Sequence, residues 1–223
     1  MNVGQPESGL LRAFAAFVSD LGDMSWSVWL VLGLCLIPEA YLFGADTGLW
    51  GNPRDRAIAF DFLGFWAGLL GNWTPNYPTQ PYLMFLTYGF LHAGPVHFSI
   101  NMLTLSSLGA PVAAAIGAWR FLLLYLMLLI AGAIGFALFP EVHAPMVGAS
   151  GALFGLAGVV LAWDMQRRKA DALSRWPVLG SLAVLVVLNA VLWWAMNGQL
   201  AWQTHLGGFL AGWCIAYVMR PRS

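Results

Sequence analysis

The sequence predicts an all-α membrane protein with six transmembrane helices and a long loop between the first and second of them. Hydrophobic residues make up 60% of the 223 residues and charged residues only 9%, whereas a soluble domain carries about 25% charged residues. Crossing about 30 Å of hydrocarbon takes about 20 residues of helix. Six apolar runs approach or exceed that length, near 25–44, 95–113, 119–139, 148–164, 176–196 and 200–219.

These runs predict a short cytoplasmic N-terminal segment (1–24), a membrane domain (25–219) and a cytoplasmic C-terminal tail (220–223). Hydrophobicity alone does not locate the start of the second helix, because the apolar sequence begins well before it. The pair Gly94-Pro95 marks a turn, and proline suits the first position of a helix. We therefore expect this helix to begin at Pro95 and residues 81–92 to form an interfacial or re-entrant lead-in.

The distribution of positive charge predicts that both termini lie on the inner side of the membrane. The inner segments of that topology carry Arg12, Arg120, Arg167, Arg168, Lys169, Arg175, Arg220 and Arg222. The outer segments carry only Arg54 and Arg56. An excess of eight against two follows the positive-inside rule.

The long outer segment, 45–94, contains an aromatic piece that is too short to span. Its sequence, Phe60–Trp73, reads FDFLGFWAGLLGNW and is nearly uncharged. We expect it to lie in the outer interface, with tryptophan and phenylalanine at headgroup depth. The alternative is an apolar folded loop that only covers helix ends.

Several kinds of partner and chemistry are disfavoured by the composition. The net charge is zero and no basic run interleaves with aromatic residues, so we expect no nucleic-acid partner. Cys35 and Cys214 lie far apart in apolar runs, which favours neither a disulfide nor a metal site. The chain has no H-E-x-x-H motif, no aspartate pair in its spans and no signal-peptide pattern at its start. We expect neither metal nor cofactor.

Four polar residues on three predicted helices share one shallow layer near the outer surface. At about 1.5 Å per residue, Ser150 lies about 3–6 Å below the outer end of its helix and His205 about 8 Å below. His97 lies at about 3 Å and Asn101 at about 9 Å, one turn apart on one helix face. Polar groups in a bilayer are costly and are usually functional or paired.

Each of these residues also has a structural explanation. Ser150 lies beside the G-x-x-x-G of Gly151 and Gly155, a pattern that favours close helix packing. His205 and Asn101 would then be interhelical hydrogen bonders. Of the remaining histidines, we expect His143 in a solvated loop and His92 stabilising the lead-in before the second helix.

The alternative explanation is nucleophilic catalysis. A serine hydroxyl becomes a nucleophile beside a general base, commonly histidine. Ser150 opens its helix, so nearby backbone N–H groups lack partners and could bind an oxyanion. Gly148 and Gly151 would let a substrate carbonyl approach, and Phe154 could hold the imidazole ring. With no carboxylate evident in the membrane, the sequence favours a Ser–His dyad.

The motifs HFSIN, GASGALFG and HLGGFLAG, in this order on successive apolar segments, resemble the rhomboid intramembrane serine proteases. LTYGFLHAGPVH and WRFLLLYLMLLIAG are also similar, so the resemblance covers about 77–219. It implies a six-helix rhomboid-like bundle with Ser150 as nucleophile and His205 as base. The implied oxyanion site contains His97, Asn101 and the Ser150 N–H, with Gly148 shaping the approach. Phe154 takes a ring-stacking position that is often tyrosine, and His92 matches a structural position.

The chain departs from this family at two places. Many relatives carry a Trp-Arg pair in the outer loop, for which Arg54 and Arg56 are weak substitutes. Many also carry glutamate shortly after the second helix, where this chain reads GAPVAAA. These departures bear on loop stability and substrate docking more than on the chemistry.

The resemblance implies an endopeptidase that cleaves transmembrane segments of membrane-anchored proteins near the outer leaflet. The substrate would be another membrane protein. A six-helix core without appended domains or a transit peptide suits an integral protein of a bacterial inner membrane. A silent scaffold that binds or sorts membrane-protein clients remains the alternative. A small transporter is disfavoured, because no buried carboxylate and no repeated pair of broken helices is evident. The oligomeric state is left open.

Overall fold

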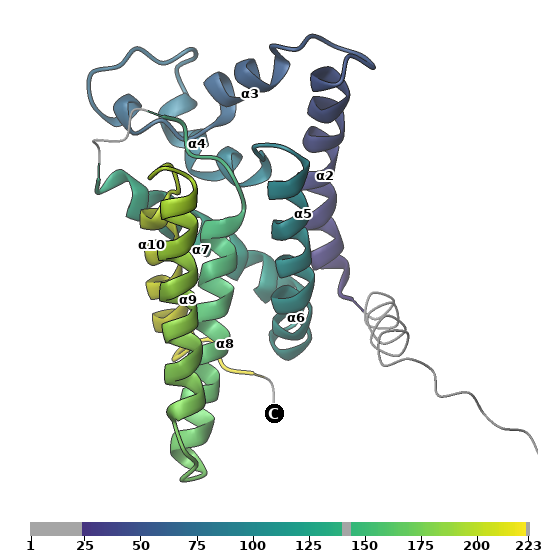
Figure 1. The fold of residues 1–223 in the computed structure, drawn as a ribbon. Helices are drawn as coiled ribbons and strands as arrows, with labels where there is room; N and C mark the ends of the chain where they lie inside the picture. The colour runs from purple at the N-terminus through teal and green to yellow at the C-terminus, as the bar shows by residue number, and fades with distance from the viewer. Residues whose placement is uncertain (1–23, 140–143, 222–223) are drawn as a thin grey trace, which may run out of the picture.

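The computed structural model describes residues 24–139 and 144–221, which fold into a bundle of helices (Figure 1). In chain order the elements are α2 (Trp26–Asp46), α3 (Asp55–Leu63), η1 (Ala67–Leu70), α4 (Gln80–Thr87), η2 (Tyr88–Phe90), α5 (Pro95–Thr104), the π-helical turn η3 (Leu105–Gly109), α6 (Ala110–Ile116), α7 (Ala118–Ala137), α8 (Ser150–Ala170), α9 (Trp176–Ala195) and α10 (Trp202–Ile215). Most of the predicted N-terminal segment, part of the C-terminal tail and the predicted loop residue His143 lie outside the described residues.

A helical segment occupies the position of each of the six predicted spans, and four of these segments are long and apolar enough to cross a membrane. These four are Trp26–Asp46, Pro95–Ile116, Ala118–Ala137 and Trp176–Ala195. Helix α8 has 21 residues, but its last turns are polar and charged. Helix α10 has 14 residues, or about 21 Å at 1.5 Å per residue. The chain is therefore a helical membrane protein, and the crossings by α8 and α10 stay predictions.

The second predicted span begins at Pro95, as the Gly94-Pro95 signal indicated. Gly94 has φ +115°, a backbone angle that glycine adopts without steric cost. Helices α5 and α6 and the π-turn η3 between them form one segment, Pro95–Ile116. The lead-in at 81–92 contains most of α4 and all of η2, and the aromatic piece 60–73 contains the end of α3 and η1.

Helices α7, α8 and α10 form the tightly packed part of the bundle. A Cβ on Gly208 or Gly212 of α10 would overlap the carbonyl oxygen of Gly151 or Gly155 of α8. On the other side of α10, a Cβ on Gly207 would lie only 2.8 Å from the Cα of Gly135 in α7. The G-x-x-x-G patterns therefore bring three backbones into contact, as small residues do in membrane helices.

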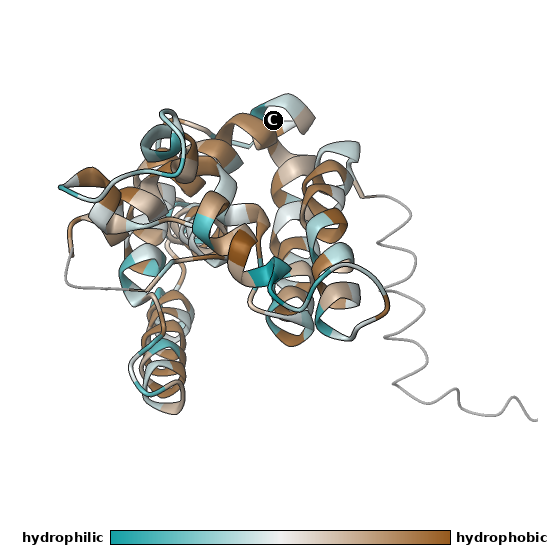
Figure 2. Cartoon of the chain, turned by 90° about the horizontal axis from the view of Figure 1, so that it is seen from above, coloured by the Kyte–Doolittle hydropathy of each residue, from teal (hydrophilic) through white to brown (hydrophobic). Residues whose placement is uncertain are grey.

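Large apolar side chains remain exposed on the outward faces of the helices. Figure 2 shows hydrophobic residues along helices on both sides of the bundle. Helix α9 is the extreme case, because Val178 alone is buried among its residues, all of which the structure describes. Exposed apolar faces of this extent match a lipid environment.

Candidate active site

The N-terminus of α8 is fixed by backbone hydrogen bonds to distant segments. Phe65 and Met146 exchange two N–H···O bonds of 3.0 and 2.9 Å, which form an isolated antiparallel bridge. Two residues further on, the Gly148 N–H donates to the carbonyl oxygen of Tyr88 at 2.9 Å. These bonds hold the segment that delivers Ser150 to the first position of α8.

The side chains of Ser150 and His205 are joined by a hydrogen bond. The distance from His205 Nε2 to Ser150 Oγ is 2.8 Å, and the exposed fraction of His205 is 4%. The two residues are 55 positions apart in sequence. They meet because the glycine contacts bring α8 and α10 close together at this depth.

The other ring nitrogen of His205 contacts Asn189 in α9, a residue that our sequence reasoning missed. The distance from His205 Nδ1 to Asn189 Oδ1 is 2.7 Å. An amide oxygen only accepts, so Nδ1 carries the proton and the lone pair of Nε2 points to Ser150. The hydrogen-bonded pair Ser150–His205 thus has a third residue bound to it. The missed signal was a lone asparagine in an apolar helix.

Phe154 stacks on the imidazole of His205, as its spacing from Ser150 predicted. The ring centroids are 4.1 Å apart and the planes are 5° from parallel. Phe154 lies one turn after Ser150 on the same helix. The imidazole is therefore fixed at one face by Phe154 and at its edge by Asn189.

His97 and Asn101 on α5 face the backbone directly before Ser150. Gly148 has φ +121°, and a Cβ on it would lie 2.9 Å from His97 Nε2 and 3.7 Å from Asn101 Nδ2. His97 Nδ1 accepts from the Ala93 N–H at 3.3 Å, so Nε2 of the neutral ring carries the proton. Asn101 Nδ2 is buried without a hydrogen-bond partner among the described residues. Two donors are thus available beside the N-terminus of α8.

Gly148 and Gly151 differ in their surroundings, which corrects one expectation. Gly148 lies against His97 and Asn101, next to which the sequence had predicted it. Gly151 instead faces α10, where a Cβ would lie 2.6 Å from Thr204 Oγ1. Gly151 therefore serves the contact between α8 and α10, together with Gly155.

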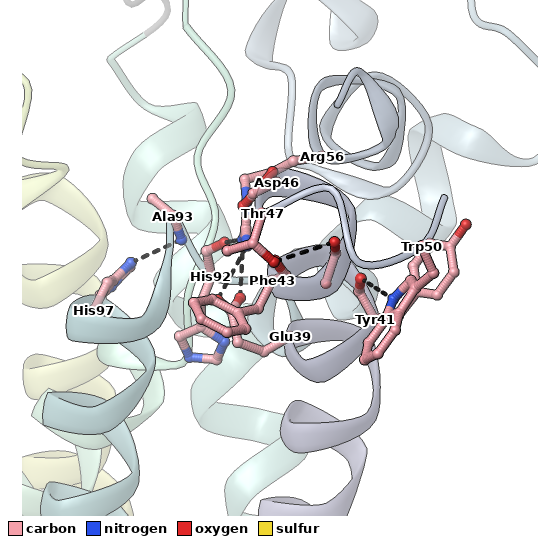
Figure 3. Close-up of polar contacts among 11 residues, drawn as sticks. Glu39, Tyr41, Phe43, Asp46, Thr47, Trp50, Arg56, His92, Ala93 and His97 are labelled. Carbon is pink, nitrogen blue, oxygen red and sulfur yellow. Dashed lines mark hydrogen bonds and ion pairs between the residues drawn. The ribbon is translucent and has the colours of Figure 1, made fainter. Parts of the chain in front are cut away.

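A buried ion pair between α2 and α3 corrects one further expectation (Figure 3). Glu39 of α2 is 4% exposed and binds Arg56 of α3 through both carboxylate oxygens, at 2.9 and 3.1 Å. A buried carboxylate is thus present in the first span, although it is paired with an arginine. Arg56, expected to be a weak substitute for the Trp-Arg pair, also binds Asp46 at 2.7 Å and the carbonyl oxygen of His92 at 2.5 Å.

Local electrostatics keep Arg56 charged and His92 neutral. Burial by itself would lower the pKa of Arg56, but the hydrogen bonds to Glu39 and Asp46 outweigh it and raise that pKa. Burial, with a smaller effect of His97, lowers the pKa of His92 to about 3. The ring of His92 packs edge-on against His97 and Phe98, with centroids at 5.2 and 5.4 Å. This agrees with the structural role that we expected for His92.

A cavity of about 470 Å³ opens beside His205 on the side of α9. Its walls are almost entirely apolar. They are formed by Phe154, Leu182, Leu185, Val186, Asn189, Ala190, Trp193, Trp202, His205, Leu206 and Phe209. The cavity can hold an apolar side chain within reach of the His205 ring.

The fold and the site together define a helical membrane protein with a hydrogen-bonded serine and histidine among its helices. A family model described as the Rhomboid domain matches residues 79–222. The chain belongs to the rhomboid family, which confirms the resemblance of its motifs.

Individual relatives support the same assignment. RHOMBOID-like protein 2 of Arabidopsis thaliana is 36% identical over 138 residues, which are 60% of this chain and 41% of the relative. Rhomboid protease GluP of Bacillus subtilis is 33% identical over 131 residues, or 59% of this chain and 25% of the relative. Rhomboid protein 1, mitochondrial, of Saccharomyces cerevisiae is 35% identical over 133 residues, which are 55% of this chain and 38% of the relative. The matched segment spans less than half the length of each of these relatives.

Proposed function

We propose that this chain is an intramembrane serine endopeptidase that cleaves transmembrane segments of membrane-anchored proteins. The observation that carries the proposal is the hydrogen-bonded series Ser150–His205–Asn189, with bonds of 2.8 and 2.7 Å. The family and its relative GluP, which is named a protease, point to the same class of reaction.

In the proposed mechanism His205 is the general base for Ser150. The Oγ proton moves to Nε2 while Oγ attacks the carbonyl carbon of the scissile peptide bond. The imidazolium then gives this proton to the leaving amine, which departs and leaves an acyl-enzyme on Ser150. A water molecule, deprotonated by the same Nε2, releases the acid. Asn189 keeps the proton on Nδ1 throughout, which preserves the productive tautomer.

The developing oxyanion is bound by three N–H donors, of which Asn101 Nδ2 has no other partner among the described residues. His97 Nε2–H and Asn101 Nδ2–H lie beside Gly148, and the Ser150 N–H is free because it begins α8. The positive end of the α8 dipole adds to their field. Removing one oxyanion donor lowers kcat by about 10²- to 10³-fold in serine proteases.

The proposed substrate and topology rest on the cavity beside the site, on the predicted depth of the site and on the distribution of positive charge. The apolar cavity beside His205 suits side chains of a transmembrane segment, and the shallow depth predicted for the site favours cleavage near the outer leaflet. We propose six crossings in a bacterial inner membrane, with both termini on the inner side as the positive-inside count favours. A peptide bond must leave helical geometry to be attacked, so segments with small residues and weak helices are the preferred substrates.

The test is covalent labelling of the purified protein in detergent with a fluorophosphonate, beside cleavage of a model transmembrane substrate. We expect wild type to be labelled and active, and Ser150→Ala and His205→Ala to lose both properties. Melting temperatures serve as the control for folding. Undiminished cleavage by Ser150→Ala would refute the mechanism, and a folded wild type without label or cleavage would favour the silent scaffold.

A further inference from the structure

Arg56 binds a peptide group that also contacts the proposed oxyanion donor His97 (Figure 3). The guanidinium donates from Nη1 to the carbonyl oxygen of His92 at 2.5 Å. The next N–H along the chain, that of Ala93, donates to His97 Nδ1 at 3.3 Å. The C=O of His92 and the N–H of Ala93 belong to one peptide bond, so Arg56 and His97 bind opposite sides of the same planar group.

We infer that Arg56 is a positioning residue for His97 and acts through the peptide group between His92 and Ala93. A peptide group is rigid, with its C=O and N–H pointing in opposite directions. Fixing the carbonyl oxygen toward Arg56 therefore fixes the N–H toward His97 Nδ1. This bond in turn fixes the proton of the neutral ring on Nε2, which faces Gly148. The role rests on the proposed function, because His97 matters for catalysis only as an oxyanion donor.

The surroundings show why this peptide group needs an external anchor. It lies in the short turn between η2 and α5, next to Gly94, whose φ of +115° marks a non-helical backbone. Among the described residues, the side-chain hydrogen bond to this carbonyl oxygen comes from Arg56. Arg56 thus supplies the polar contact that orients the carbonyl.

Arg56 is itself held rigidly, which a positioning residue requires. Glu39 binds Nη1 and Nη2 at 2.9 and 3.1 Å, and Asp46 binds Nε at 2.7 Å. Both carboxylates come from α2, and the Arg56 side chain is only 14% exposed. A hydrogen bond from a cation also polarises the amide and strengthens its N–H as a donor. The proton position on His97 is therefore linked to two carboxylates of another helix.

The experiment measures the tautomer of His97 directly. Full-length protein labelled with ¹⁵N-histidine is studied by NMR, in which protonated and unprotonated ring nitrogens have different shifts, and His97→Gln identifies the His97 signals. Arg56→Gln removes the guanidinium, Arg56→Lys keeps the charge with a single amine, and Arg54→Gln removes a charge from an exposed position two residues away. Kinetics on a model transmembrane substrate give kcat and KM separately.

We expect wild-type His97 to carry its proton on Nε2 and Arg56→Gln to show a mixture of both tautomers. The same variant should lose about tenfold to a hundredfold in kcat, with KM unchanged, because an oxyanion donor acts in the transition state. Arg56→Lys should be intermediate, and Arg54→Gln should equal wild type in both measurements.

Three results would overturn the inference. In the first, His97 of the wild type carries its proton on Nδ1. In the second, Arg56→Gln is folded and keeps the wild-type tautomer of His97 and the wild-type kcat. In the third, Arg54→Gln changes the His97 tautomer as strongly as Arg56→Gln does. The first needs no Arg56 variant, only the assignment by His97→Gln, so it holds even if Arg56→Gln does not fold. The tautomer measurement also needs no proteolysis, so a wild type without activity would contradict the proposed function and leave this test intact.

Discussion

Replacing Asn189 by alanine tests whether the third residue of the site contributes to catalysis. The change removes the only acceptor that the described residues offer to His205 Nδ1, at 2.7 Å. A hydrogen bond of this kind contributes about 0.5–1.5 kcal/mol, and leaving a buried donor unpaired costs about 1–3 kcal/mol. At about 1.4 kcal/mol per factor of ten, we expect kcat to fall about tenfold, and up to a hundredfold if Nδ1–H stays buried and unpaired.

The assay is cleavage of a model transmembrane substrate in liposomes, with kcat and KM determined separately. Val186→Ala is the matched control, because Val186 lines the same cavity from α9 without a polar contact to His205. We expect KM to change alike in both variants and kcat to fall only in Asn189→Ala. If Asn189→Ala kept the kcat of Val186→Ala, the asparagine would have no part in positioning the base.

Three other predictions concern the stacking ring, the helix contact and the buried histidine. Phe154→Tyr should keep the kcat of wild type, whereas Phe154→Ala should lose about threefold to tenfold in kcat, because an aromatic stack contributes about 0.5–1.5 kcal/mol. Equal kcat of Phe154→Ala and wild type in substrate cleavage would contradict this. Gly207→Ala would place a Cβ 2.7 Å from a carbonyl oxygen of α7 and should lower the unfolding free energy by about 1–3 kcal/mol, while Gly180→Ala, with open space around it, should not. In the folded protein the pKa of His92 is lowered to about 3. Between about pH 6.5 and 3 only the unfolded state binds this proton, so stability falls as pH falls, by at most about 1.4 kcal/mol per pH unit. Between pH 7 and 4 the unfolding free energy of His92→Phe should therefore depend less steeply on pH than that of wild type, and identical slopes would refute this.

The sequence predicted those features that depend on local rules. Helix positions followed from the length of the apolar runs, and the start of α5 followed from the Gly94-Pro95 pair. The common depth of Ser150 and His205 in the membrane stays a prediction, made from the expected topology and the rise per residue. Their approach to 2.8 Å depends on glycines that the sequence already marked as contact residues.

Residues outside recognisable motifs were missed or misjudged. Asn189 is one polar residue in an apolar helix, and nothing local indicates the rotation that turns it toward His205. Glu39 was overlooked as a buried carboxylate, because its partner Arg56 lies 17 residues away, at the start of the short helix α3. Gly151 was assigned to the substrate approach, whereas the helix crossing gives it to α10. The contacts of these three residues depend on long-range packing, which local patterns in a single sequence do not predict.

The π-turn η3 sets the direction in which the outer half of its helix faces. A π-turn accommodates one additional residue in a helix, and one residue corresponds to a rotation of about 100° at 3.6 residues per turn. Below η3, α6 packs against α7, and above it α5 presents His97 and Asn101 to Gly148. Deleting one residue from 105–109 would let α5 and α6 continue as one regular helix and swing both donors away from α8. The π-turn η3 thus rotates α5 relative to α6, so that one segment can pack in two directions.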